Sequence, residues 1–414
     1  MSRSLTRDGL LVVLSDGGTR LLTFIANAYL AKVLAPTSYG IAFLGLTILS
    51  YGMLPADLGL YALGVREMAK ERSQREFQFS DLLWLRTMLG LAGMLLTGIG
   101  ILLFVHEGQS RSVALLFLLA LIPSLWQMDW YYQGGRRYSE LTLIRYLFSG
   151  SYLAGIWFFV SGDNNLERIP LIYSASIVLA AVAAFVLKRD SEPILPRESF
   201  FNPKLWREWR EILRRSIPIG LGSILAQSVP LIPPIVIAAM YDEEQVGLFG
   251  AAFRLTMILL VVDRTFFTLF LPRIARVNTS SPERAPEVLR RTFRWLILIG
   301  LCLGVGIIPI AEPIVIVVNR SEYAGAALPL ILMSWFVSAT ILTTFFSYAL
   351  VAAGYERAYF QAALVSTPIT LLLIFLLTWQ FGIVGTAVSI SLAEIIMATL
   401  MYGKFRRHLD VRLW

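Results

Sequence analysis

The chain has 414 residues, of which 57% are hydrophobic and 15% are charged, whereas an ordinary soluble domain carries about 25% charged residues. This composition, with a mean hydropathy of +0.67, excludes a soluble globular protein. The apolar runs are long and continuous, which excludes a transmembrane β-barrel, because barrel strands alternate in polarity over about ten residues. The net charge of +8 then relates to membrane topology and not to nucleic acid.

A bilayer-spanning helix needs about 20 mostly apolar residues. The apolar runs, bounded by charges and turn residues, predict an all-α polytopic membrane protein with twelve transmembrane helices. The six expected in the first half cover residues 9–34, 39–63, 82–105, 111–133, 139–160 and 168–187. The six expected in the second half cover residues 216–240, 246–272, 292–318, 325–352, 359–379 and 382–403.

The distribution of basic residues predicts the orientation of these helices. An even number of spans places both termini on one side of the membrane, and most of the 36 Lys and Arg residues fall in segments on that side. The other side receives only Arg111, Arg168 and Arg320. Because positively charged loops stay in the cytoplasm, we expect both termini to be cytoplasmic.

A long segment rich in charge and proline, residues 188–215, separates the two sets of six helices. We therefore predict an N-terminal lobe at 1–187, a cytoplasmic linker at 188–215, a C-terminal lobe at 216–403 and a cytoplasmic tail at 404–414. The basic linker is expected to contact anionic membrane lipids.

The two halves carry traces of an internal duplication. The first helix has polar residues that share one face through their 4, 3, 4 spacing, namely Asp16, Arg20, Thr23 and Asn27. The seventh helix repeats this spacing with Ser216, Gly220, Ser223 and Gln227. Two parallel six-helix repeats are an architecture of alternating-access transporters, although small and polar residues at this spacing also serve simply to pack helices together.

The sequence contains few residues that could bind a metal through Cys or His or form a disulfide. The single cysteine, Cys302, lies within an apolar run, and the two histidines, His106 and His408, lie far apart. Neither residue type forms a ligand cluster with metal-binding spacing. We expect no metal and no cofactor apart from a coupling H⁺ or Na⁺.

Two short segments resemble a known family. The first is Asp57-Leu58-Gly59-Leu60 followed by Gly64-Val65-Arg66-Glu67-Met68-Ala69, and the second is Asp129-Trp130-Tyr131-Tyr132-Gln133-Gly134. Both resemble segments of the Wzx-like flippases for polysaccharide and O-antigen units. This branch belongs to the MOP superfamily (multidrug, oligosaccharidyl-lipid and polysaccharide exporters), together with the MATE drug exporters.

The resemblance implies a bacterial inner-membrane flippase with two six-helix lobes around a central cavity. Its substrate would be an undecaprenyl-diphosphate-linked oligosaccharide, moved from the cytoplasmic to the periplasmic leaflet by alternating access. A downstream polysaccharide polymerase is the implied partner. Residues of the two segments would lie at the cytoplasmic entrance, and these are Asp57, Arg66, Asp129, Trp130, Tyr131 and Gln133. The aromatic residues among them would either anchor helices at the membrane interface or stack on sugar rings.

Ionisable residues within the bilayer cost about 3 kcal/mol each on insertion scales and normally face a cavity or a partner. Arginine suits an anionic diphosphate, because its planar guanidinium binds phosphate oxygens and stays charged. We therefore expect the substrate to be bound by Arg20, Arg254, Arg264, Thr23, Asn27 and Gln227. An alternative for Arg20 is an ion pair with Asp16, one helical turn away.

Carboxylates inside transporters commonly bind a proton or a cation. The candidates for ion coupling are Asp16, Glu394, Glu312 and Asp263. Glu312 lies between Pro309 and Pro313, where a break or a solvated helix end is the alternative explanation.

Two rival functions follow from the same residues. A MATE-like exporter of organic cations would share the repeat architecture, but its site would need carboxylates and aromatics without arginines. A membrane enzyme acting on the same lipid would need catalytic residues on an ordered loop, and the sequence has no Ser/His/Asp set and no glycine-rich nucleotide loop. We therefore expect a transporter and not an enzyme.

Overall fold

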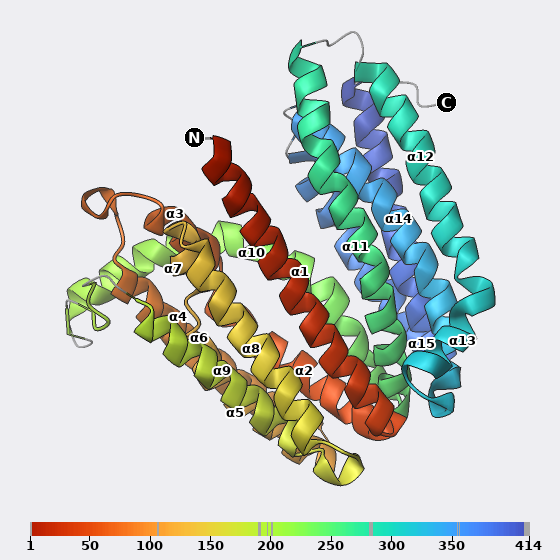
Figure 1. Cartoon of the computed structure of the whole chain (residues 1–414), viewed down its shortest axis with the longest axis horizontal. Helices are drawn as coiled ribbons and strands as arrows, with labels where there is room; N and C mark the ends of the chain where they lie inside the picture. The colour runs from red at the N-terminus through yellow and green to blue at the C-terminus, as the bar shows by residue number, and fades with distance from the viewer. Residues whose placement is uncertain are drawn as a thin grey trace. The chain divides into compact units, whose positions relative to one another are not determined.

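The computed structural model describes residues 2–105, 107–188, 192–196, 198–199, 202–280, 285–353, 355 and 357–409. Within them it leaves out the side chains of 2–16, 222–230, 261–262, 264–280, 285, 351–352 and 409. The described chain is helical, with short 3-10 turns and loops between the helices. The prediction of an all-α membrane protein is confirmed (Figure 1).

The first six predicted spans coincide with helices, although two of these helices are broken. The elements are α1 (Ser2–Val33), α2 (Pro36–Asp57), α3 (Leu60–Met68), α4 (Phe79–Phe104), α5 (Gln109–Leu119), α6 (Leu121–Leu125), α7 (Asp129–Gly134), α8 (Tyr138–Phe159) and α9 (Arg168–Val186). The span predicted at 39–63 is divided at Gly59, whose φ of 80° lies in the left-handed region that glycine tolerates. The span predicted at 111–133 is divided into α5, α6 and α7.

The second half also supplies six spans. Its elements are α10 (Pro203–Met240), α11 (Glu243–Ser280), α12 (Ala285–Gly306), α13 (Ala311–Val318), α14 (Ala327–Ala352) and α15 (Arg357–Leu409). The last of these contains both final spans, because Gly382, with a φ of 59°, turns the chain between them. Helix α10 begins well before the predicted 216, so the second part of the linker is helical and continuous with the seventh span.

Seven helical stretches are long and apolar enough to cross a membrane by length and composition, among the residues that could be searched. One of them, Arg357–His408, comprises the last two spans. The chain is therefore a multi-pass membrane protein.

Several hydroxyl groups inside the spans are satisfied within their own helix. The hydroxyl groups of Thr47, Thr87 and Ser124 each donate to the carbonyl four residues earlier, at 2.7–2.9 Å. This arrangement suits a lipid environment, where no water is present to satisfy a buried hydroxyl.

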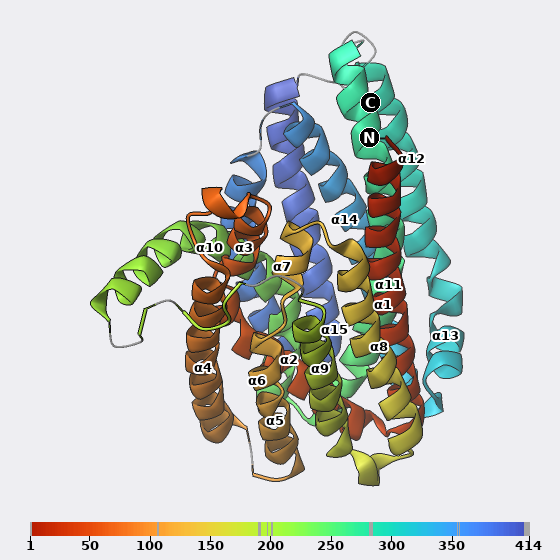
Figure 2. The same ribbon diagram turned by 60° about the vertical axis from the view of Figure 1, so that its left-hand side comes forward.

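The chain divides into two compact units, Met1–Leu231 and Ile232–Trp414. The division lies inside α10, while the lobe boundaries inferred from the sequence remain a prediction. In the first unit α1 packs along α8, and α2 packs against α4 and α5 (Figures 1 and 2). In the second unit α14 is central and packs against α11, α12 and α15 (Figure 2).

Each unit has its own hydrophobic core. In the first unit, one core cluster gathers aromatic and aliphatic residues of α3, α4 and α7 with Leu205, Trp209 and Ile212 of α10. In the second unit, a cluster centred on Phe293, Phe345 and Phe405 joins α12, α14 and α15. The apolar residues at the start of α10 recur at helical spacing, so this extension is held against the first unit by burial of one face.

Candidate functional site

The polar stripe of α1 is partly accessible in the first unit. Arg20 is exposed, while Thr23 and Asn27 are half-buried, and the Asn27 amide donates to the Thr23 carbonyl at 2.8 Å. Gly18 leaves room for the Tyr146 side chain of α8, because a Cβ there would overlap the Tyr146 hydroxyl. The side chain of Asp16 lies outside the described part of the chain, so its pairing with Arg20 stays a prediction.

Arg254, the other first choice for phosphate, lies inside the second unit. Its side chain on α11 is 9% exposed, and its Nη2 donates to Oδ1 of Asn319, which follows α13 and is 1% exposed. Little of this arginine is therefore accessible from the surface of the second unit. The side chains of Gln227 and Arg264 lie outside the described residues, and their roles stay predictions.

Two of the carboxylates expected to couple an ion are brought together in the second unit. Asp263 on α11 is 7% exposed and accepts a hydrogen bond from Oγ1 of Thr344 on α14 at 3.3 Å. Glu394 on α15 is close enough to Asp263 for their charges to interact. By contrast, Glu312 at the start of α13 is exposed, which fits its alternative explanation as a solvated helix end.

The two family-like segments, far apart in the sequence, pack against each other in the first unit. Helices α3 and α7 come close because two glycines at their contact have no side chain. A Cβ on Gly64 would overlap the Trp130 ring, and a Cβ on Gly134 would overlap Val65 and Met68. The glycines of both segments thus serve one contact. Neither the proximity nor this use of the glycines followed from the sequence.

Hydrogen bonds extend this contact to polar groups. The Asp57 carboxylate accepts from the Tyr61 backbone N–H at 3.2 Å, directly across the break at Gly59. The Tyr61 hydroxyl in turn donates to Oε1 of Gln133 on α7. The first segment is therefore joined to the second by side chains as well as by close backbone packing.

Two arginines that sequence reasoning missed complete this cluster. Arg86, 7% exposed on α4, donates to the Gln127 carbonyl at 3.3 Å, and its charge interacts with those of Asp57 and Asp129. Arg145 on α8 donates to Oδ2 of Asp129 at 2.8 Å. The sequence could have indicated both arginines, because each is a basic residue inside an apolar run. Such a charge needs a partner in the protein interior.

The residues expected at the cytoplasmic entrance thus have different environments. Arg66 is exposed, and Asp57, Asp129 and Gln133 are half-buried within the polar cluster. Trp130 and Tyr131, at 2% and 4% exposure, are packed around Phe79 in the core. In this structure their ring faces are covered by protein, so stacking on a sugar would require the core of this unit to open.

The sequence matches a known protein family. The model of a family described as polysaccharide biosynthesis protein matches residues 5–278. The chain belongs to this family, and the resemblance to the Wzx-like polysaccharide and O-antigen proteins is confirmed.

Two curated relatives match over most of their length. The chain is 20% identical to a candidate O-antigen transporter of Escherichia coli (strain K12), over 96% of each protein. It is 22% identical to a protein assigned provisionally as a low-salt glycan biosynthesis flippase of Haloferax volcanii, over 90% of this chain and 77% of the relative.

Solved structures share the fold. The lipid II flippase MurJ, in an inward closed conformation, gives a TM-score of 0.72 at 15% identity, over 95% of this chain and 87% of MurJ. A MATE family multidrug transporter of the MOP superfamily, facing inward, gives 0.70 at 15% identity, over 95% of this chain and 94% of that protein. These matches are to transporters and flippases and not to catalytic enzymes.

Proposed function

We propose that the protein is a flippase that moves undecaprenyl-diphosphate-linked oligosaccharide units from the cytoplasmic to the periplasmic leaflet of a bacterial inner membrane. Both termini would be cytoplasmic. The observation that carries this proposal is membership of a polysaccharide biosynthesis family with similarity to an O-antigen transporter over nearly the whole chain. A similarity to a capsular polysaccharide biosynthesis protein of Staphylococcus aureus, 20% identical over 60% of this chain, points to the same class of substrate.

The chemical task is to carry a charged, hydrated head group across hydrocarbon. An unaided ion would lose its hydration at a cost of tens of kcal/mol. The exposed guanidinium of Arg20 on α1 offers a replacement for water at the diphosphate, with Thr23 and Asn27 beside it as hydrogen-bonding groups. The polyprenyl tail would stay in the lipid, and no covalent bond would form or break.

The energy for the cycle would come from an ion gradient. We assign the coupling site to the buried Asp263 on α11 and the half-buried Glu394 on α15, because two interacting carboxylates favour binding of H⁺ or Na⁺ over two bare charges. Ion binding would then alter the packing of these helices against α14, which supplies Thr344. Released oligosaccharide-lipid would pass to a polysaccharide polymerase.

A deletion experiment in the host tests the flippase function. Loss of the gene should remove surface glycan and leave lipid-linked units in the cytoplasmic leaflet, with rescue by the wild type. We expect Arg20→Ala to fail in this rescue and Arg20→Lys to rescue partly, because lysine keeps the charge without the planar fork. The matched control is Arg407→Ala, which removes an exposed arginine near the end of α15.

A MATE-like exporter of organic cations is the alternative function, favoured by the fold similarity alone. It would bind its cargo through carboxylates, so Arg20→Ala would leave drug export intact. Normal glycan in a deletion strain that lacks any second flippase would refute the proposed function and leave the cation exporter as the better interpretation.

A further inference from the structure

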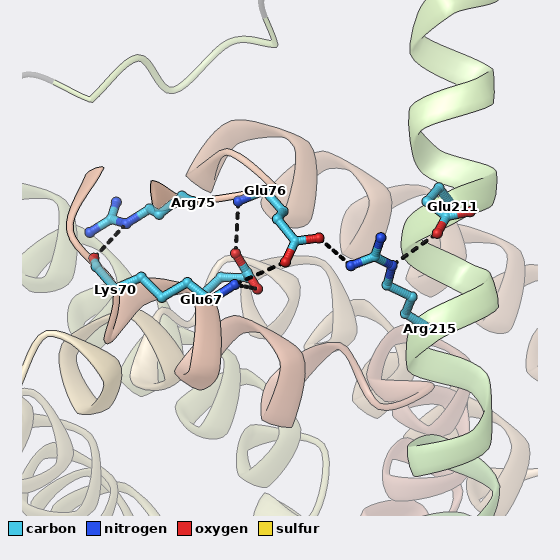
Figure 3. Close-up of polar contacts among 6 residues, drawn as sticks. All are labelled: Glu67, Lys70, Arg75, Glu76, Glu211 and Arg215. Atoms are coloured by element: carbon cyan, nitrogen blue, oxygen red, sulfur yellow. Dashed lines mark hydrogen bonds and ion pairs between the residues drawn. The ribbon is translucent and has the colours of Figure 1, made fainter. Parts of the chain in front are cut away.

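Five charged residues of alternating sign run from the core of the first unit to α10 (Figure 3). We call these residues, Glu67, Lys70, Glu76, Arg215 and Glu211, the ionic strip. Oε1 of Glu67 lies 2.7 Å from the Lys70 ammonium, which is 3.3 Å from Oε1 of Glu76. The other oxygen of Glu76 pairs with Arg215 on α10, whose Nε lies 2.9 Å from Glu211. The strip thus links the loop between α3 and α4 to a residue 139 positions away.

The two ends of the ionic strip differ in burial. Glu67 is 1% exposed and also accepts the backbone N–H of Glu76 at 3.0 Å, so it holds the loop in place. Glu76 and Arg215 are 45% and 43% exposed, so water reaches their ion pair. Because solvent weakens an exposed pair far more than a buried one, the Glu76–Arg215 contact is the part of the strip that separates most readily.

A second ion pair fixes the same loop independently of α10. Arg75 pairs with Glu192 of the linker, and both side chains are largely buried, at 13% and 6% exposure. Arg75 also donates to the Lys70 carbonyl at 3.2 Å. The loop therefore keeps its position on the first unit when Arg215 leaves.

The charges of the strip persist over a wide pH range. The hydrogen bond from Arg215, followed by that from Lys70, lowers the pKa of Glu76 from its ordinary 4.5. The hydrogen bond to Glu67 raises the pKa of Lys70 from its ordinary 10.5. Both groups stay charged at neutral pH, so protonation is not what separates the pair.

Helix α10 contacts the first unit through the buried face formed by Leu205, Trp209 and Ile212, and again at two glycines. A Cβ on Gly59 would overlap the Ser216 carbonyl, and a Cβ on Gly220 would overlap Leu58. Helix α10 is thus held at the break between α2 and α3, and the neighbouring Arg215 holds it at Glu76. Further along, the division between the two compact units falls between Leu231 and Ile232 of the same helix. Helix α10 is consequently a continuous connection from one unit to the other.

We propose that the Glu76–Arg215 ion pair is a releasable latch that stabilises one conformation of the transport cycle by holding α10, at Arg215, to the loop between α3 and α4. The proposal rests on the proposed function, because alternating access requires one repeat to move against the other. The buried Glu67 and the Arg75–Glu192 pair keep the loop in place, and the exposed pair opens and closes during each cycle.

A reversible tether tests whether the contact must open. Glu76→Cys and Arg215→Cys are introduced together in a Cys302→Ser background, since Cys302 is the free, exposed cysteine of the chain. Bis-methanethiosulfonate linkers of increasing length then join the two positions. The matched control joins Glu211→Cys to Arg215→Cys, which removes the same arginine but forms a tether within α10 only.

Flipping is measured in proteoliposomes with an undecaprenyl-diphosphate-linked oligosaccharide that carries a fluorescent terminal sugar. We expect the shortest linker between positions 76 and 215 to abolish flipping and a reductant to restore it. The control tether should leave the rate within about twofold of its reduced form. An unchanged rate with positions 76 and 215 joined would overturn the proposal, because the contact would then never need to open.

A second measurement does not depend on the substrate. Spin labels at the exposed positions Gln74 and Arg214, next to an intact ionic strip, report the separation of the loop and α10. We expect two distances between the labels. Glu76→Gln, Arg215→Gln and high salt should each raise the population at the longer distance about two- to fivefold relative to the population at the shorter one. The double variant should add nothing to either single variant. One separation that no variant shifts would refute the latch, whereas absence of flipping by the wild type would refute only the proposed function.

Discussion

Replacement of Arg86 by methionine removes the positive charge from the polar cluster at the helix breaks and keeps a side chain of similar length. Arg86 is 7% exposed inside α4. It donates to the Gln127 carbonyl, and its charge interacts with those of Asp57 and Asp129. The substitution therefore removes a hydrogen bond from the Gln127 carbonyl and the positive charge near Asp57, while Asp57 keeps the Tyr61 N–H and Asp129 keeps its ion pair with Arg145 at 2.8 Å.

The size of the effect follows from these contacts. Removing one partner from a buried charge cluster costs about 3–5 kcal/mol. Because Asp129 remains paired and Asp57 is only half-buried, we expect a loss near the lower limit, about 3 kcal/mol. Arg86→Lys keeps the charge and loses the planar donor geometry, so its loss should be about 1 kcal/mol.

The free energy of unfolding can be measured by SDS titration in mixed micelles, with tryptophan fluorescence as the signal. Trp130 is a suitable reporter, because it is buried in the adjacent core. Adding Asp57→Asn to Arg86→Met removes the uncompensated carboxylate and should recover about 1–2 kcal/mol. A loss under about 1 kcal/mol for Arg86→Met, or a further loss in the double variant, would refute the assignment of Arg86 as the counter-charge of this cluster.

Three further predictions concern other parts of the chain. Gly59→Ala should destabilise the protein by about 2 kcal/mol or more in the same titration, because the left-handed backbone at this glycine and the carbonyl of α10 both exclude a Cβ. Gly150→Ala, in open space within α8, should stabilise the protein by up to about 1 kcal/mol. Equal changes in the free energy of unfolding for Gly59→Ala and Gly150→Ala would contradict this reasoning. The lowered pKa of Glu76 means that its contribution to stability is present above the ordinary carboxyl pKa and is lost as the pH falls through the lowered value. The unfolding midpoints of the wild type and Glu76→Gln should therefore differ by a constant amount from about pH 5 to about pH 8 and converge in stronger acid, and a gap that persists there would count against this linkage. Glu394→Gln should abolish the dependence of flipping on a proton or sodium gradient, whereas Glu312→Gln should not, and gradient-dependent flipping by Glu394→Gln would exclude it from coupling.

The sequence predicted the elements that depend on local composition. Each expected span is helical, although some are divided between helices, because about 20 apolar residues in lipid can satisfy their backbone groups only in this way. The helical start of α10 was assigned to a linker, although the spacing of Leu205, Trp209 and Ile212 indicates an amphipathic helix. The segment was assigned to the linker because it is rich in charged residues and proline, and the apolar periodicity within it was not used.

The candidate site was predicted only in part, because its contacts join residues that are far apart in the chain. Asp57 and Asp129 were selected from their segments, but nothing local shows that Arg86 interacts with both. The same holds for Arg215, whose partner Glu76 is 139 residues away. Composition identifies which charges need a partner, and only the fold decides which partner each one receives.

Several arginines of the first unit stabilise the ends of helices, and this separates them from the binding candidates. Arg111 donates to the carbonyl that follows α4 at 2.8 Å, Arg168 donates to the last carbonyl of α8 at 3.1 Å, and Arg137 donates to the carbonyl that follows α9 at 2.6 Å. Each guanidinium thus satisfies a carbonyl that has no partner within its own helix and complements the negative end of the helix dipole. Arg20 has a different position, since it lies in the middle of α1, far from a helix C-terminus, and is exposed. The capping arginines bond to helix ends, so the proposal that Arg20 recognises phosphate rests on its exposed position within the helix and not on the number of arginines in this unit.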